Sequence, residues 1–154
     1  MQETRAKEIS LRPIAELVPS PKNRNKHSDE QVAALAESIR VEGIRNPLIV
    51  SNRSGHLVCG HGRLLALKKL GAEVAPVMFQ DFDSEASEYA YGVSDNALAK
   101  RSELDFSGIH FDIAEIGPFD LDQLGIKDFK LEPDPEPEKK EKKKKVCPNC
   151  SHEW

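Results

Sequence analysis

Residues 57–71 combine a short apolar strand, a glycine turn and a helix. The strand-like Leu57-Val58-Cys59 stops at Gly60-His61-Gly62-Arg63, and a leucine-rich helical pattern follows as far as Gly71. A turn of this kind brings the backbone close to an anion, and the helix start adds unpaired N–H groups and the positive end of the dipole. Because Arg63 adds a fork of donors, the segment predicts a phosphate site. The local residues support equally well a tight turn whose glycines only supply positive φ.

The segments around this turn predict alternating strands and helices. Ser28 and Gln31 form a capping box, which starts a helix that ends at the C-cap residue Gly43. A second helical pattern runs from Ser84 to Ala99 and begins with an acidic turn, in which Glu88 is expected to be exposed. The expected strands cover residues 9–18, 47–50, 56–59 and 74–79.

Turn residues and proline refine this arrangement. Residues 51–55 predict a hairpin between the second and third of these strands. Pro76 favours an edge position for the strand at residues 74–79, because proline cannot donate to a ladder. After residue 104 the pattern predicts only short helical pieces and turns.

The length of 154 residues suits one domain and a tail. No run approaches the roughly 18 apolar residues of a membrane span, and the first residues lack a hydrophobic signal region. We therefore expect no membrane association and a cytoplasmic location, in a bacterial cell or a phage-infected host. Three cysteines, two of them close together, do not make a disulfide framework.

The net charge of −4 hides two regions of opposite sign. Residues 139–154 hold six lysines against two glutamates, which gives +4 and leaves −8 for residues 1–138. An acidic body is a poor generic DNA binder, because duplex affinity rests on cations that meet phosphates. Any attraction to DNA is therefore expected in the lysine-rich tail or in a local basic patch.

The C-terminal region predicts no packed core. Residues 131–146 are a linker, first rich in Pro and Glu and then in Lys. Residues 147–154 resemble one knuckle of a zinc ribbon, with Cys147, Cys150 and His152 as the candidate ligands. Zinc prefers four ligands, so the site would have to be shared between two chains. The alternative is a free dithiol on a basic tail.

Several segments together resemble the N-terminal domain of the ParB/sulfiredoxin superfamily. The resemblance covers residues 8–130 and is closest to the phage subgroup that is often fused to DNA methyltransferases. It implies a mixed α+β fold, in which a small sheet is flanked by helices and followed by a disordered C-terminal tail. The matching segments are residues 23–25, 33–39, 43–50, 60–66, 70–71 and 94–99.

The resemblance also implies the site residues. The Gly60-His61-Gly62-Arg63 turn matches the segment that holds nucleotide phosphates, and Ser38 matches a helix position facing the same pocket. Asp95 and Asn96 match a pair that helps to hold a metal ion, and their oxygens suit Mg²⁺. Without the resemblance, Asn96 is a helix-interior hydrogen bonder and Asp95 a solvated acid.

Two departures from the superfamily narrow the chemistry. Sulfiredoxins need a cysteine where this chain has His61, and Cys59 is expected to be a small buried hydrophobe, so the chain is not a sulfiredoxin. Partition proteins carry Glu-Arg where this chain has His61-Gly62, which places CTP switching of their type in doubt. We expect their helix-turn-helix and dimerisation domains to be absent, because the residues after position 104 leave no room for them.

Three functions remain open. The first is a ParB-like module that binds nucleotide phosphates in phage or mobile-element DNA metabolism, and so assists DNA modification or packaging. The second is a metal-dependent nuclease or nucleoside triphosphatase, with His61 and Asp95 as the candidate catalytic residues. The third is an adaptor, which recruits a methyltransferase or terminase to DNA through its lysine-rich tail. We also expect three other ligands or partners. These are a nucleoside triphosphate with Mg²⁺, zinc at the C-terminal knuckle, and a second copy of the chain.

Overall fold

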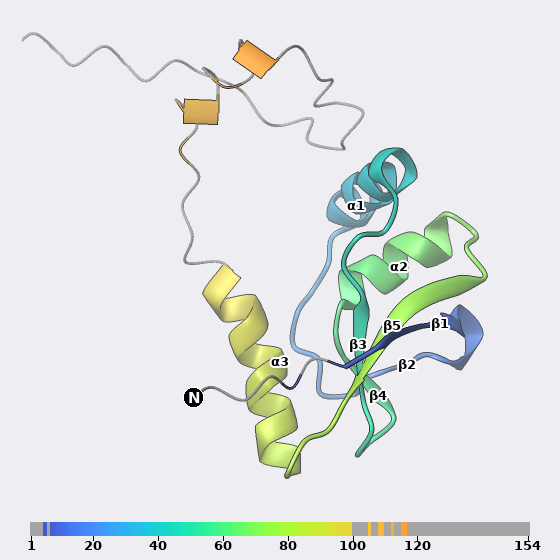
Figure 1. The fold of residues 1–154 in the computed structure, drawn as a ribbon, viewed down its shortest axis with the longest axis vertical. Helices are drawn as coiled ribbons and strands as arrows, with labels where there is room; N and C mark the ends of the chain where they lie inside the picture. The colour runs from blue at the N-terminus through green and yellow to red at the C-terminus, as the bar shows by residue number, and fades with distance from the viewer. Residues whose placement is uncertain are drawn as a thin grey trace, which may run out of the picture.

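Five strands form one mixed sheet in the order β1-β5-β3-β4-β2 (Figure 1). The computed structural model describes residues 5, 7–99, 105, 108–109, 112 and 115–116. The strands are β1 (Ile9–Pro13), β2 (Val18–Pro19), β3 (Leu48–Ser51), β4 (His56–Cys59) and β5 (Val74–Gln80). The helices are the short 3-10 helix η1 (Ile14–Glu16) and the α-helices α1 (Asp29–Glu42), α2 (His61–Lys69) and α3 (Glu85–Ala99).

The two faces of the sheet are covered by different helices. Leu57 and Val58 are neighbours on β4, so their side chains point to opposite faces. Leu57 is fully buried in the main core, together with Leu64 and Leu67 of α2. Val58 instead packs against α3, where the backbone comes close at Gly92. Figure 1 shows α1 and α2 side by side, with α3 apart from them.

The predicted α1 forms, but only the Ser28 half of its predicted capping box is present. The Ser28 hydroxyl accepts a hydrogen bond from the Gln31 backbone N–H at 3.1 Å, and Gly43 ends the helix with φ +75°. The Gln31 side chain does not close the box, because it lies 3.0 Å from His27 Nδ1. The start of α3 has a reciprocal box, in which Ser84 and Ser87 each accept from the other's backbone N–H.

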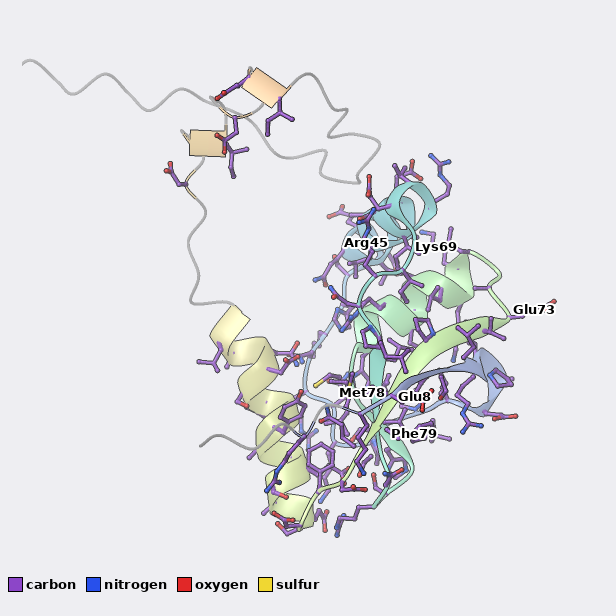
Figure 2. The ribbon with its side chains drawn as sticks, in the orientation of Figure 1. Glu8, Arg45, Lys69, Glu73, Met78 and Phe79 are labelled. Carbon is purple, nitrogen blue, oxygen red and sulfur yellow. The ribbon has the colours of Figure 1, made fainter. Side chains whose placement is uncertain are left out.

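The prediction that residues 74–79 form an edge strand is wrong, because β5 pairs with β1 on one side and with β3 on the other. The sheet tolerates Pro76 because β3 pairs only with Val77 to Gln80 of β5. Pro76 itself lies opposite Leu11 of β1. Figure 2 shows Glu73 at the tip of the turn before β5, pointing away from the body.

The prediction that Glu88 is exposed is also wrong, since this residue is only 9% exposed. The expected hairpin between β3 and β4 is confirmed. The linker at 131–146 and the knuckle at 147–154 lie outside the described residues, as do most of residues 104–130. Within the described part of the chain, no helix is long and apolar enough to cross a membrane.

Candidate functional site

The glycine turn is built around a left-handed residue. Gly60 caps the N-terminus of α2 with φ +98°, and a Cβ at this position would lie 2.5 Å from Leu48 Cδ2. The first backbone hydrogen bond of α2 runs from the Leu64 N–H to the Gly60 carbonyl at 2.9 Å. The N–H groups of the first helical turn therefore have no acceptor inside the helix, as the sequence predicts.

Gly62 has a packing role. A Cβ on Gly62 would lie 3.0 Å from His27 Cε1 and 3.1 Å from Leu35 Cδ1. The missing side chain lets α1 and the segment before it pack closely on the start of α2. Contacts within the protein thus explain both glycines of the turn, which agrees with the tight-turn alternative. An anion contact at the backbone of residues 60–63 stays a prediction.

His61 connects the turn to the N-terminal loop. Its side chain is buried, and Nε2 accepts a hydrogen bond from the Ser20 backbone N–H at 3.3 Å. Burial lowers the pKa of His61, and the neighbouring His27 lowers it further. The ring is therefore neutral near pH 7 and carries its proton on Nδ1, which is a donor rather than a general base.

Arg63, unlike His61, lies outside the residues that line the pocket described below. Its Nη1 donates to the Asn46 carbonyl at 2.9 Å, across the segment between α1 and β3. Burial lowers the pKa of Arg63, while the nearby Asp95 and Cys59 raise it. Arg63 thus combines a structural contact with a charge that faces the carboxylate of α3.

Cys59 has the properties of an inert thiol. It is 1% exposed, and the charge of the nearby Asp95 carboxylate disfavours a thiolate at this position. Burial raises the pKa of Cys59 to about 12, and Asp95 adds to the increase. The interpretation of Cys59 as a buried hydrophobe is confirmed, because almost no thiolate exists at neutral pH.

A pocket of about 580 Å³ lies between the N-terminal loop and α3. The loop at residues 20–25 forms one wall, the β3–β4 hairpin another and α3 the third, with His61 also lining the cavity. Lys22, Arg24 and Arg53 bring positive charge to it, whereas Tyr89 and Val93 add apolar surface. A volume of this size is typical of small-molecule sites.

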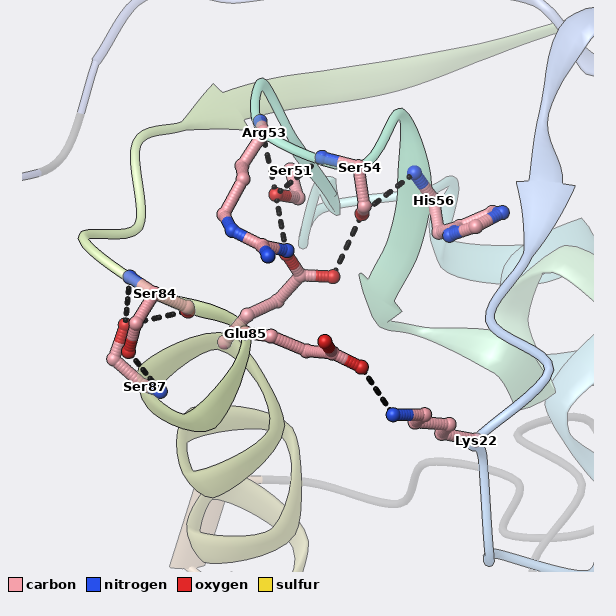
Figure 3. Close-up of polar contacts among 9 residues, drawn as sticks. Lys22, Ser51, Arg53, Ser54, His56, Ser84, Glu85 and Ser87 are labelled. Carbon is pink, nitrogen blue, oxygen red and sulfur yellow. Dashed lines mark hydrogen bonds and ion pairs between the residues drawn. The ribbon is translucent and has the colours of Figure 1, made fainter.

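A network centred on Glu88 attaches α3 to the hairpin beside this pocket (Figure 3). The Glu88 carboxylate accepts from Ser51 Oγ at 2.8 Å and from Ser54 Oγ at 2.7 Å, and it lies 3.5 Å from Arg53 Nη1. Ser51 Oγ also accepts from the backbone N–H groups of Arg53 and Ser54. A buried carboxylate is stable here because hydroxyl donors and a cation satisfy it.

The structure brings together only part of the predicted site. His61 and Asn96 line the pocket, whereas Asp95 lies beside Cys59 and Arg63. Adjacent helix positions point in different directions, so Asp95 and Asn96 do not face one common point. Ser38 is half-buried on α1 and, like Gly60 and Gly62, lies outside the pocket lining.

Asn96 lines the pocket and is also hydrogen-bonded to its own helix. Its Nδ2 donates to the Gly92 carbonyl at 2.8 Å, which is the hydrogen bond expected of a helix-interior asparagine. Among the described residues, no group of three His, Cys, Asp or Glu side chains is arranged to hold a metal ion. Cys147, Cys150 and His152 lie outside the described residues. The magnesium and zinc sites stay predictions.

Sequence reasoning missed the residues that line the other walls of the pocket. Lys22, Arg53 and Ser54 lie in segments for which the sequence predicts only a loop or a turn, and the sequence predicts that Glu88 is exposed. The one local signal was Ser51-x-x-Ser54, whose hydroxyls cap the hairpin turn. Their partner on α3 follows only from the tertiary packing.

Comparison with known proteins gives the same fold. The family model of the ParB N-terminal domain matches residues 1–96. The ParB-like nuclease domain-containing protein YnaK of Escherichia coli is 41% identical over 70 residues, which cover 46% of this chain and 79% of YnaK. A nucleoid occlusion protein of Halalkalibacterium halodurans is 33% identical over 94 residues, 58% of this chain and 33% of that protein. The chain thus spans most of YnaK and about a third of the second relative.

Two solved structures share the architecture. The C-terminally truncated chromosome-partitioning protein ParB of Caulobacter crescentus, complexed with CTP-γ-S, gives a TM-score of 0.64 at 20% identity. The match covers 77% of this chain and 72% of that one. A Pnob8-like ParB N-domain gives a TM-score of 0.52 at 26% identity, covering 75% and 49%. The predicted α+β fold of the ParB/sulfiredoxin type is confirmed.

Proposed function

The chain belongs to the family of the ParB N-terminal domain, and from that membership we propose that it binds the phosphates of a nucleoside triphosphate. Its role is that of a binding module in the DNA metabolism of a phage or mobile element, where it assists DNA modification or packaging. It works in the cytoplasm of the bacterial or phage-infected cell.

The observation that carries this proposal is the gathering of cations at one pocket of an acidic protein. Residues 1–138 have a net charge of −8, yet three cations, Lys22, Arg24 and Arg53, line the same cavity, where they outnumber the two carboxylates of Glu85 and Glu88. Chain segments far apart supply these cations, and a loop and a hairpin hold them in place. A small phosphorylated ligand fits such a local concentration of charge better than a duplex does.

The pocket lining offers groups that suit both parts of a nucleotide. The cations suit phosphates, and His61 adds an Nδ1–H donor at the start of α2. Tyr89 and Val93 of α3 offer apolar surface for a base or sugar. The family relationship supports the same assignment, since the ParB of Caulobacter crescentus was solved with CTP-γ-S. Of the two predicted magnesium ligands, Asn96 lines this pocket and is the candidate to meet a Mg²⁺ ion that arrives with the phosphates.

A metal-dependent nuclease or nucleoside triphosphatase is the second candidate, favoured by the 41% identity to YnaK, a ParB-like nuclease domain-containing protein. The described residues support it less than binding. His61 is neutral and already accepts a hydrogen bond, and Asp95 lies beside Arg63 and Cys59 rather than in the pocket. Two-metal hydrolysis needs a denser cluster of acidic ligands.

We propose three kinds of partner: DNA, a second copy of this chain, and a DNA methyltransferase or terminase. The six lysines of residues 139–154 would attract DNA without sequence preference and with strong salt dependence. Removing residues 139–154 should abolish DNA association and leave nucleotide affinity unchanged. DNA binding that survives this truncation would reject an adaptor role based on the tail. Metal analysis of the intact protein, with one zinc per dimer as the expected ratio, tests the shared knuckle.

The decisive experiment is a thermal-shift screen of nucleoside triphosphates with and without Mg²⁺. A ligand at 100 times its Kd stabilises the folded state by about 2.7 kcal/mol, which a melting curve resolves easily. Arg24→Gln should reduce the shift strongly. Arg12→Gln is the matched control, because Arg12 stacks over Phe79 at 5.1 Å and does not line the pocket. Absence of any shift with every triphosphate would reject the proposal.

A further inference from the structure

Two carboxylates of α3 pair with two of the cations that line the pocket, and Figure 3 shows the pair of Glu85 with Lys22. Glu88 lies 3.5 Å from Arg53, and Glu85 pairs with Lys22 of the N-terminal loop. The two pairs differ in burial. The side chain of Glu88 is 11% exposed, whereas those of Glu85 and Lys22 are 58% and 56% exposed.

The two carboxylates also differ in their other contacts. Glu88 receives hydrogen bonds from Ser51 and Ser54, so it holds α3 on the hairpin. For Glu85 the described residues offer one hydrogen-bond partner, Lys22, and the charge of Arg53 also acts on it. The Glu85 carboxylate therefore pairs with one pocket cation, lines the same cavity as Arg53, and takes no part in the Glu88 network.

The Lys22–Glu85 pair also separates two hollows. A second, more open hollow of about 640 Å³ shares Lys22, Arg24, Glu85 and Tyr89 with the main pocket. The pair thus lies where the two hollows meet, and its separation would join them into one groove. Because both side chains are more than half exposed, the pair is weak and can be displaced by a stronger anion.

We propose that Lys22 and Arg53 form a phosphate subsite whose place is taken by the Glu85 carboxylate when the pocket is empty. A bound polyphosphate displaces Glu85 into water and frees the first turn of α3, while Glu88 keeps the helix attached. Glu85 is thus a built-in competitor that lowers the affinity of the pocket for anions. This inference rests on the proposed function, since it concerns the same pocket.

The test uses the full-length protein, calorimetry, and inorganic tripolyphosphate as the probe. Glu85→Gln removes the competing charge, so it should tighten tripolyphosphate binding by about threefold or more. An uncharged nucleoside should bind both proteins equally. Asp81→Asn is the matched control, because Asp81 forms an equally exposed pair with Lys7 and lines neither hollow. This variant should stay within about twofold of the wild type.

A second variant tests the shared cation. Lys22→Gln should weaken tripolyphosphate binding more in the Glu85→Gln protein than in the wild type, because Glu85 no longer occupies Lys22 there. If Glu85→Gln binds tripolyphosphate no more tightly than the wild type does, Glu85 is not a competitor and this inference is wrong. The proposed function still holds in that case if the wild type binds tripolyphosphate and Arg24→Gln does not. Absence of binding by both the wild type and Glu85→Gln would overturn both proposals.

Discussion

The Glu88 carboxylate accepts a hydrogen bond from Ser51 Oγ at 2.8 Å, which joins α3 to a turn that lies 37 positions earlier in the chain. Both residues are buried, with Ser51 fully inaccessible. This contact and the Gly92–Val58 contact hold α3 on the sheet, and α3 forms one wall of the pocket. The site therefore depends on a polar contact as well as on apolar packing.

Glu88→Ala should destabilise the protein by about 2–3 kcal/mol, because it leaves two hydroxyl donors and Arg53 without their acceptor. Urea unfolding followed by circular dichroism measures the change. Asp83→Ala is the control, since this acidic residue just before α3 forms an exposed ion pair with Arg5 and its side chain is 81% exposed. Its expected effect is below about 0.5 kcal/mol. Equal losses for the two variants would show that the Glu88 network adds no stability.

Gly60→Ala should destabilise the fold by about 3 kcal/mol or more, since it adds a clash to left-handed backbone strain. The new Cβ would lie 2.5 Å from Leu48, a side chain with no exposed surface. Gly71→Ala isolates the strain alone, because Gly71 has φ +70° and nothing within 4 Å of its Cβ position. That variant should lose about 1–2 kcal/mol. Chemical unfolding of both proteins checks the difference, and equal losses would contradict the close approach to Leu48.

His61 should make the protein less stable in mild acid. Burial keeps its folded-state pKa below the ordinary value of 6.5, so the unfolded chain takes up a proton first as the pH falls. The free energy of unfolding should therefore decrease from about pH 7 downward, until the folded state also binds the proton. His61→Gln should show a smaller decrease between pH 7.5 and pH 5.5 in urea titrations. An identical decrease in both proteins would argue against a buried neutral imidazole.

Cys59 should resist alkylation in the folded protein. Its pKa of about 12 leaves almost no thiolate at pH 8, and its side chain is 1% exposed. Iodoacetamide should leave Cys59 unmodified under native conditions, as measured by peptide mass spectrometry. In about 8 M urea, the denatured control, it should modify Cys59 fully. Rapid native modification would show that the strand end opens or that Asp95 does not disfavour the thiolate.

Arg63→Ala should weaken triphosphate binding by about tenfold or more, if the glycine turn takes part in holding the phosphates. Because Arg63 also donates to the Asn46 carbonyl, the melting temperature of the ligand-free variant must be measured alongside. Calorimetry gives the affinity. An unchanged affinity would restrict the phosphate contacts to the cations of the loop and the hairpin.

The local elements were predictable because their signals lie within a few residues. Ser28 and Gln31 start α1, Gly43 ends it, and residues 51–55 close the hairpin, each through contacts inside one turn. The strand position of Pro76 was not predictable. It depends on where β3 begins to pair with β5, and that register involves residues about 30 positions apart.

The sequence by itself determined the family, the order of the elements and the glycine turn, because these follow from short-range patterns and from matching segments. Tertiary structure decided what each side chain of the site meets. It directed Arg63 toward Asn46 and Asp95, brought Lys22 and Arg53 to one pocket, and paired Glu85 with Lys22. The reason is physical: a charge finds its partner by packing across the fold, and residues 22 and 85 become neighbours only when α3 settles on the sheet.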